Sequence, residues 1–276
     1  MIIDASHADT EPGFDLEQFS VNGYATGMGV ELRHPIMRSR EENLYGSFRF
    51  DMGKSSTKSV VDVTRSDRNR AFSLGFDYDR LDTLWNIAAN SMSIKFKHGV
   101  DLFNASDAGD PQMTRDNGEP QFFKIEAEAQ RLQRVTDNIS ALFGIKAQWS
   151  ADPLLSGDEF GVGGRDYGRG YDPSEITGDD GVAAKVELRW REPVTMPVFE
   201  RPYEVYGFYD VGRVWNQDEN ARTLKRNSLA SAGVGLRLDI TDSLDLEGYL
   251  AIPLTREVDT RNAENRRAFF RLTQTF

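Results

Sequence analysis

Hydrophobic and polar residues alternate with a period of two along most of this 276-residue chain. Residues 181–191 show it most clearly, because their even-numbered positions are apolar and most of their odd-numbered positions are charged. Such alternation is typical of a β-strand with two unlike faces. The pattern predicts about eleven strands, at residues 23–35, 43–53, 69–80, 84–98, 120–132, 138–150, 181–192, 203–215, 228–240, 244–252 and 267–276.

The connections between these strands alternate in length, and each strand is close to the roughly 9–11 residues of a tilted membrane-spanning strand. Short turns at one end and long loops at the other are typical of outer-membrane β-barrels, whereas a soluble β-sandwich would also alternate along each strand. Backbone groups in lipid must be paired internally, so such strands close into a barrel. The long connections lie near 54–68, 99–119, 151–180, 216–227 and 253–266, the short ones near 36–42, 81–83, 133–137 and 241–243, and 193–202 is intermediate.

The sequence therefore predicts an all-β, antiparallel transmembrane β-barrel over residues 23–276, with 151–180 as a long loop in its lumen. Eleven strands is an odd number, whereas single-chain bacterial barrels have an even one. Residues 14–21 could supply a twelfth, and 1–22 are otherwise expected to be an N-terminal extension or partial strand. The chain ends on Phe276 at the close of an alternating segment, as outer-membrane barrels commonly do.

The composition supports this interpretation and excludes several classes of function. Hydrophobic content is 39%, low for a globular core of this size, while aromatic residues still reach 11%. A net charge of −11 argues against nucleic-acid binding, which needs a basic surface. Cysteine is absent, so disulfides, thiolate metal sites and cysteine nucleophiles are excluded.

The sequence predicts neither an enzyme nor a cofactor. The three histidines are not spaced as metal ligands, and His98 near Asp101 is a weak candidate for a catalytic pair. The glycine-rich segment 163–181 does not fit a phosphate-binding loop, because its glycines are wrongly spaced and its many carboxylates would repel phosphate. The same carboxylates could bind calcium, although their spacing does not match an EF-hand.

The segment 154–190 resembles the large inward-folded loop and following strand of two-partner secretion transporters, the haemolysin-activator (ShlB/FhaC/HecB) family of the BamA-type superfamily. A tetrad of the form [VG]-R-G-[FY] marks the loop tip in that superfamily, and a motif of the form F-x-D-x-G lies on a later strand. The tetrad here is Gly168, Arg169, Gly170 and Tyr171, continued in this family by Asp172 and Pro173, and the second motif is Phe208, Asp210 and Gly212.

This resemblance implies a translocation pore in the outer membrane of a Gram-negative bacterium that secretes a large partner exoprotein. Its implied contacts are the exoprotein, outer-membrane lipid and lipopolysaccharide, and the barrel assembly machinery, which would read Phe276. Family members begin with a plug helix and two periplasmic POTRA domains and have sixteen strands, so this chain would hold about the last eleven. An outer-membrane assembly insertase and a passive porin remain alternatives.

The resemblance also implies that the loop folds back and places Arg169 against Asp210. The face of its strand that carries Asp210 is the more polar one, so this carboxylate is expected to point into the lumen. An arginine fork matches a carboxylate bidentately, and glycines beside it allow a tight turn. The polar faces predict a wet lumen of mixed charge, or ordinary solvated charges without a transport role, lined by Lys124, Glu126, Glu128, Lys185, Glu187 and Arg189.

Overall fold

The structure, a computed structural model, describes residues 1–10, 22–58, 65–193, 201–217, 225–255 and 266–275. Twelve strands form one antiparallel sheet in which neighbours in the sheet are neighbours along the chain, apart from β7, which pairs with β10. The strands are β1 (Ile2–Thr10), β2 (Asn22–Arg38), β3 (Glu42–Lys58), β4 (Arg65–Asp82), β5 (Ala88–Gly99), β6 (Phe123–Arg134), β7 (Ile139–Ser150), β10 (Asp180–Pro193), β11 (Pro202–Trp215), β12 (Arg226–Asp239), β13 (Leu244–Pro253) and β14 (Arg267–Gln274).

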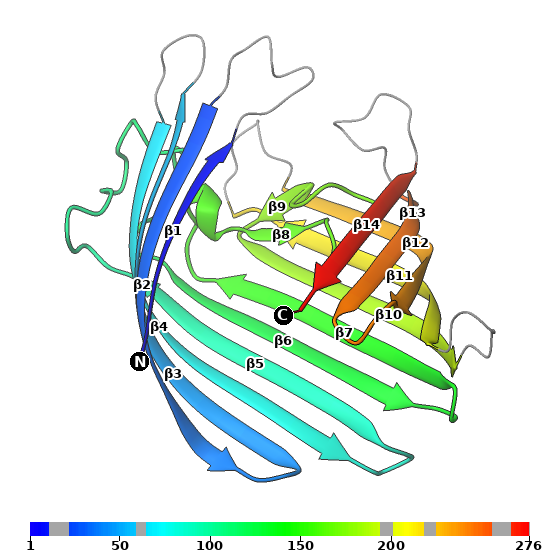
Figure 1. Cartoon of the computed structure of the whole chain (residues 1–276). Coiled ribbons are helices and arrows are strands. Elements are labelled where there is room, and N and C mark those ends of the chain that lie inside the picture. The colour runs from blue at the N-terminus through cyan, green and yellow to red at the C-terminus, as the bar shows by residue number, and fades with distance from the viewer. Residues whose placement is uncertain (11–21, 59–64, 194–200, 218–224, 256–265, 276) are drawn as a thin grey trace.

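The connection between β7 and β10 carries the remaining elements, a short 3-10 helix and a two-stranded hairpin. These are η2 (Ser156–Asp158), β8 (Phe160–Val162) and β9 (Ile176–Gly178). The sheet curves strongly, and the hairpin lies within the curve instead of extending away from it (Figure 1). The predicted inward loop at 151–180 therefore corresponds to a folded segment with its own secondary structure.

The predicted all-β, antiparallel architecture is confirmed, with three differences in the strands. Residues 2–10 form a strand paired with β2, whereas the proposed twelfth strand at 14–21 lies outside the described residues. Residues 84–87 form a turn, so β5 begins at Ala88. The strands β3 and β4 extend to Lys58 and back to Arg65, because backbone pairing continues past the point where apolar alternation ends.

The two faces of the sheet differ as the alternation predicts. Large apolar side chains on the outer face are exposed, for example Leu188 at 59%, Val234 at 60% and Leu250 at 63%. An exposed apolar face of this extent matches contact with lipid. Three of the four tryptophans lie at or near strand ends and one in a turn, as in an interfacial aromatic girdle; they are Trp85, Trp149, Trp190 and Trp215.

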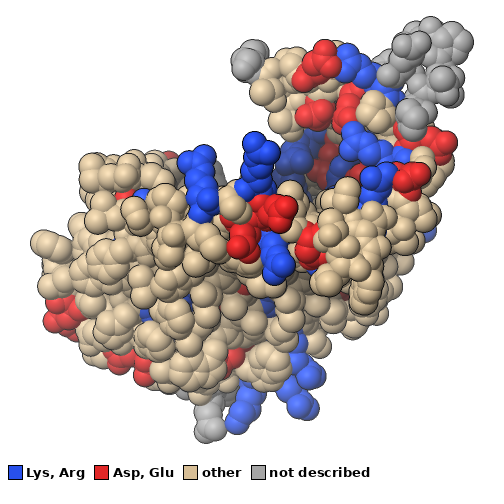
Figure 2. Space-filling view, turned by 90° about the horizontal axis from the view of Figure 1, so that it is seen from below, with Lys and Arg blue, Asp and Glu red and all other residues tan. Residues whose placement is uncertain are grey.

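The inner face holds the charged side chains and the buried core. Viewed from below, much of the surface carries no charge, and acidic and basic side chains gather around the hollow (Figure 2). The buried side chains of β11 are Tyr206, Phe208, Asp210 and Val214, which share one face of that strand. No helix in the described residues is long and apolar enough to cross a membrane.

Candidate functional site

An apolar cluster packs the hairpin loop against the inner face of the sheet. Phe160, Val162 and Tyr167 are buried from the loop side, together with Tyr171 and Ile176. The strands contribute Ala183, Val214 and Leu229, all nearly inaccessible to solvent. Burial of several large side chains gives the docked loop most of its non-directional stabilisation, at roughly 1.5–3 kcal/mol for each large apolar side chain removed from water.

Three glycines let the loop tip approach the strands closely. Gly168 has a φ of +101°, a left-handed conformation that favours glycine. A Cβ added at Gly170 would lie 2.8 Å from the Cβ of Ser231, and one at Gly212 would lie 2.5 Å from a methyl carbon of Val162. Side chains at these positions would therefore hold the loop away from the sheet.

Arg169, at the tip, reaches the carboxylate of Asp210 on β11 and binds it bidentately. Its Nε and Nη2 donate to the two carboxylate oxygens of Asp210 over 3.0 and 2.8 Å. The backbone N–H groups of Gly168 and Arg169 donate to Asp210 Oδ2 over 3.2 and 2.9 Å. Asp210 is fully buried and Arg169 is 5% exposed, so this ion pair lies outside the solvent-screened regime of surface pairs.

A second carboxylate and an aromatic ring complete the environment of the Arg169 guanidinium. Nη1 donates to Glu187 on β10 over 2.6 Å, and Glu187 also accepts from Arg189 and Arg237. The guanidinium carbon lies 3.5 Å from the centroid of the Phe208 ring, a cation–π contact. The motif residue Phe208 is thus a direct partner of the arginine.

The rest of the loop motif contacts the last strands of the sheet. Tyr171 is fully buried, and its hydroxyl lies 3.3 Å from the Thr255 hydroxyl. The backbone carbonyl of Tyr171 accepts a hydrogen bond from Arg267, which also lies 3.5 Å from the Asp172 carboxylate. Pro173 is exposed beside the turn, so the structure gives it no contact with the strands of the kind that Arg169 and Tyr171 have.

The six residues expected to line a wet lumen all lie on inner faces, but the loop covers several of them. Lys124 and Glu187 are 3% and 2% exposed, so they are buried against loop groups and do not face open water. Glu128 accepts a hydrogen bond from the Tyr167 hydroxyl over 3.1 Å, and Lys185 lies over the ring of that tyrosine. Glu126 and Arg189 are partly exposed and form ion pairs with Lys124 and Glu187.

Two further anchors hold the base of the loop, and the sequence did not reveal them. Asp158 in η2 accepts hydrogen bonds from Asn69 on β4 and Lys97 on β5, and lies 3.4 Å from Lys124 on β6. The partners of Asp158 are far from it in the chain, so no local spacing in the sequence indicates this anchor.

The second base anchor is Asp179, which is fully buried at the end of the loop. It accepts hydrogen bonds from the guanidinium of Arg115 over 2.5 and 3.2 Å and from the backbone N–H groups of Leu154 and Gln217. These residues belong to three connections at the same end of the sheet, residues 100–122, 151–179 and 216–225, so one carboxylate ties the three together.

Ionisation of the loop residues follows from burial and from their partners. Burial raises the pKa of the Tyr167 hydroxyl, and the nearby Glu128 carboxylate raises it further, so the phenol stays protonated as a donor. Burial lowers the pKa of Arg169, but the Asp210 and Glu187 carboxylates outweigh it and the net shift is upward. Burial also raises the pKa of Glu159, against the opposing effect of Arg115.

The carboxylates of the loop serve as partners of basic side chains and backbone donors. Among the described residues, no three His, Asp or Glu side chains come together in a way that could hold a metal ion. The imidazole Nδ1 of His98 lies 3.0 Å from the Phe122 carbonyl oxygen, so a backbone group is the hydrogen-bond partner of this ring.

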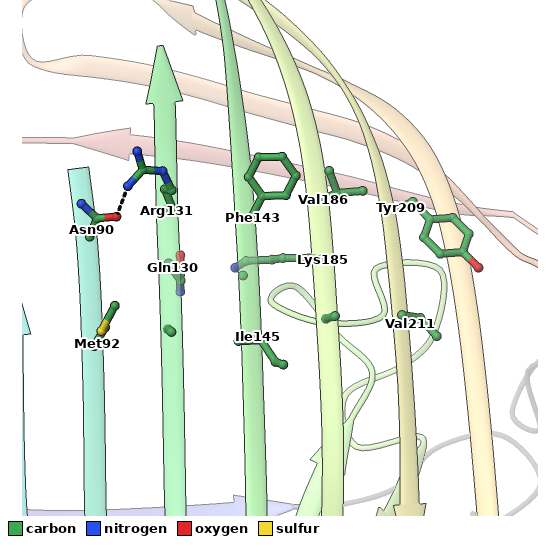
Figure 3. A pocket seen from close by; sticks show the side chains of 13 residues that line it. Asn90, Met92, Gln130, Arg131, Phe143, Ile145, Lys185, Val186, Tyr209 and Val211 are labelled. Atoms are coloured by element: carbon green, nitrogen blue, oxygen red, sulfur yellow. Dashed lines mark hydrogen bonds between the residues drawn. The ribbon is translucent and has the colours of Figure 1, made fainter. Parts of the chain in front are cut away.

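A pocket of about 660 Å³ lies on the outer face across β5, β6, β7, β10 and β11 (Figure 3). Its walls are mainly the apolar side chains that face away from the loop, so it is a depression in the lipid-facing surface. These side chains are Met92, Phe143, Ile145, Val186, Tyr209 and Val211.

The fold and the docked loop are those of an outer-membrane β-barrel protein with a loop in its lumen. Within that class, the chain belongs to the haemolysin secretion/activation protein ShlB/FhaC/HecB family, whose model matches residues 5–238. None of the curated protein sequences matches the chain closely enough to serve as a relative.

Solved structures agree with this assignment at the level of the fold. CdiB from Escherichia coli is 20% identical with a TM-score of 0.80, and CdiB from Acinetobacter baumannii is 16% identical with a TM-score of 0.68. BamA from Haemophilus ducreyi lacking POTRA domains 1–3 is 14% identical with a TM-score of 0.64. The match covers 99% of this chain in each case and 50%, 46% and 62% of the three solved chains, so this chain spans about half their length.

Proposed function

We propose that this chain forms the barrel part of a two-partner secretion pore, which moves a large exoprotein across the outer membrane. The loop 151–179 acts as the gate of that pore, and the buried contact of Arg169 with Asp210 and Glu187 holds the gate in the docked position. The observation that carries the proposal is this contact, placed in a chain that belongs to the haemolysin secretion/activation family.

The site itself favours a gated pore over a passive porin. A loop that buries eight residues of an apolar cluster and a fully buried ion pair stays docked in the absence of a trigger. A passive porin needs a permanently water-filled interior, whereas the loop here covers Lys124, Glu128 and Glu187. An exoprotein in transit would supply the interactions that displace the loop.

The remaining proposed partners are membrane lipid, which would contact the outer face, and the assembly machinery, which would bind the C-terminus. The exposed apolar face and its tryptophans support contact with outer-membrane lipid and with the acyl chains of lipopolysaccharide. The C-terminal Phe276, which lies outside the described residues, is proposed to be read by the barrel assembly machinery.

The test is secretion by the full-length protein carrying Arg169→Ala or Asp210→Ala. We expect each change to abolish release of the partner exoprotein while the barrel still inserts, as judged by heat-modifiable gel mobility. Arg165→Ala is the matched control, since the side chain of this loop arginine is 42% exposed and lies 3.7 Å from the Glu247 carboxylate. Normal secretion by Arg169→Ala would refute the gate.

Two outcomes of the same strains would point to the alternative functions. Uptake of small solutes without any exoprotein would indicate a porin. Loss of unrelated outer-membrane proteins from the membrane would indicate an assembly insertase.

A further inference from the structure

We infer that Lys185 is a second partner for Asp210 and takes it over when the loop undocks, so that opening the gate exchanges one ion pair for another. Lys146 and Glu128 form a parallel couple on the neighbouring strands. This inference rests on the proposed gating function and adds positioning residues to it on the strand side.

The strand register places both lysines directly opposite a carboxylate. Lys185 on β10 pairs with Asp210 on β11, and Glu128 on β6 pairs with Lys146 on β7. Side chains directly opposite each other on one face of an antiparallel sheet have Cβ atoms about 4.5–5.5 Å apart, well within reach of a lysine.

Neither of these two pairs is formed while the loop is docked. Within the described part of the chain, no nitrogen–oxygen contact of 4.0 Å or less joins Lys185 to Asp210 or Lys146 to Glu128. The carboxylates bind the loop instead, Asp210 through Arg169 and Glu128 through the Tyr167 hydroxyl.

The two ammonium groups lie against aromatic rings of the loop. Lys185 Nζ is 4.6 Å from the centroid of the Tyr167 ring, and Lys146 Nζ is 5.5 Å from that of Phe160. The loop therefore inserts between each lysine and its cross-strand carboxylate, and it holds both members of each couple.

Cross-strand pairs elsewhere on the same face show what happens without such insertion. Glu204 and Arg237 are directly opposite and 2.6 Å apart, and Glu247 and Arg271 are opposite and 2.9 Å apart. In both of these pairs, opposite charges in this register form an ion pair across the strands. The same is expected of Lys185 and Asp210 once the loop leaves.

Gly144 on β7 provides the place where the Lys185 side chain lies in the docked state. A Cβ at Gly144 would be 2.9 and 3.0 Å from the Cε and Cγ atoms of Lys185 and 3.0 Å from the Tyr167 hydroxyl oxygen. Figure 3 shows the side chain running from β10 toward β7, away from β11. Since Asp210 lies on β11, the glycine allows the lysine to turn away from it.

The exchange lowers the free energy of opening a gate that is locked on a buried carboxylate. When the loop leaves, Asp210 loses Arg169 and faces the lumen, where an ion pair still contributes a modest stabilisation. Pairing with Lys185 supplies that stabilisation in the open state, so the lysine makes it easier for a polypeptide to displace the loop.

The test measures undocking directly. This chain has no cysteine, so Val162→Cys introduces its single thiol at a fully buried position of the loop. The rate at which a soluble reagent labels this thiol reports the population of the open state. In the full-length protein carrying Val162→Cys, we expect Lys185→Met to slow labelling several-fold and Lys185→Arg to restore it. If Lys185 only supports Tyr167 in the docked loop, Lys185→Met will instead speed labelling, and this outcome overturns the inference.

A second measurement covers the open state itself. In an Arg169→Ala background, we expect Lys185→Met to lower the unfolding temperature by several degrees more than it does beside an intact Arg169. Lys95→Met is the matched control, because Lys95 pairs with Glu126 over 3.8 Å and is not in contact with the tip, and its effect should be additive. Equal effects of Lys185→Met in both backgrounds would overturn the exchange.

Both measurements are independent of secretion. If Arg169→Ala secretes normally but the coupling with Lys185 is present, the gate proposal fails and the exchange stands. If secretion requires Arg169 and no coupling is found, only the exchange fails.

Discussion

Removal of the Asp210 carboxylate should free the loop tip by a predictable amount. Four donors converge on this carboxylate, two from the Arg169 guanidinium and two from backbone N–H groups. Because Asp210 is fully buried, Asp210→Ala leaves Arg169 buried with an incomplete set of partners and leaves the two N–H groups unpaired. Breaking a buried pair in this way costs about 3–5 kcal/mol of docking free energy.

The expected effect on the open population follows directly. Since about 1.4 kcal/mol corresponds to a factor of ten, the thiol at position 162 should be labelled roughly 100- to 4000-fold faster in Asp210→Ala. A double-mutant cycle with Arg169→Ala should be strongly non-additive, because the two residues act as one unit. Glu204→Ala is the control, since it removes a carboxylate from the same face of β11 and is paired with Arg237 instead of the loop.

Two outcomes would contradict this reasoning. Unchanged labelling in Asp210→Ala would mean that the apolar cluster alone holds the loop. Strictly additive changes in the cycle would mean that Arg169 and Asp210 stabilise docking through different partners.

Three further changes test other parts of the structure. Gly170→Ala should undock the tip, since its Cβ would lie 2.8 Å from Ser231, whereas Gly157→Ala should be neutral because nothing lies within 4 Å of the added carbon; thiol labelling compares the two. Leu188→Arg should destabilise the membrane-inserted barrel by roughly 2–4 kcal/mol and Leu188→Phe should not, as measured by unfolding in bilayers. Asp179→Ala should make residues 100–122 more sensitive to protease by removing the bidentate carboxylate partner of Arg115, and the exposed Asp107 serves as the control site.

The strand pattern could be predicted because both faces of each strand are under strong and opposite constraints. A lipid-facing position must be apolar and a lumenal one can be charged, so residues such as Leu188 and Glu187 mark their faces unambiguously. The strand at 2–10 lacks this contrast, since each of its faces carries one isoleucine, one alanine and one aspartate, and its pairing with β2 comes from backbone hydrogen bonds that leave no periodic trace. Strand ends were missed for the same reason.

The tip contact could be reached only in part from the sequence. The resemblance and the two-residue period together placed Arg169 opposite Asp210. Glu187 was recognised as lumenal, but its role as the second carboxylate depends on the register of β10 with β11, which sets it opposite Phe208. Periodicity excludes a slip by one residue, which would exchange the two faces, but a slip by two residues keeps them, so the exact register also depends on connection geometry.

The positions of the three polar anchors suggest how the loop moves. The tip anchor at Arg169 is 169 − 158 = 11 residues from the base anchor at Asp158 and 179 − 169 = 10 residues from that at Asp179. Asp179 directly precedes β10, and Asp158 is held by side chains of β4, β5 and β6, so the sheet already fixes the chain at both base anchors and keeping them costs an opening loop little freedom. Releasing them would instead detach the neighbouring connection that Asp179 holds through Arg115. We therefore expect opening to release the tip and swing residues 159–178, with both base anchors kept, so that substitutions at the tip change gating and substitutions at the base change the outer mouth.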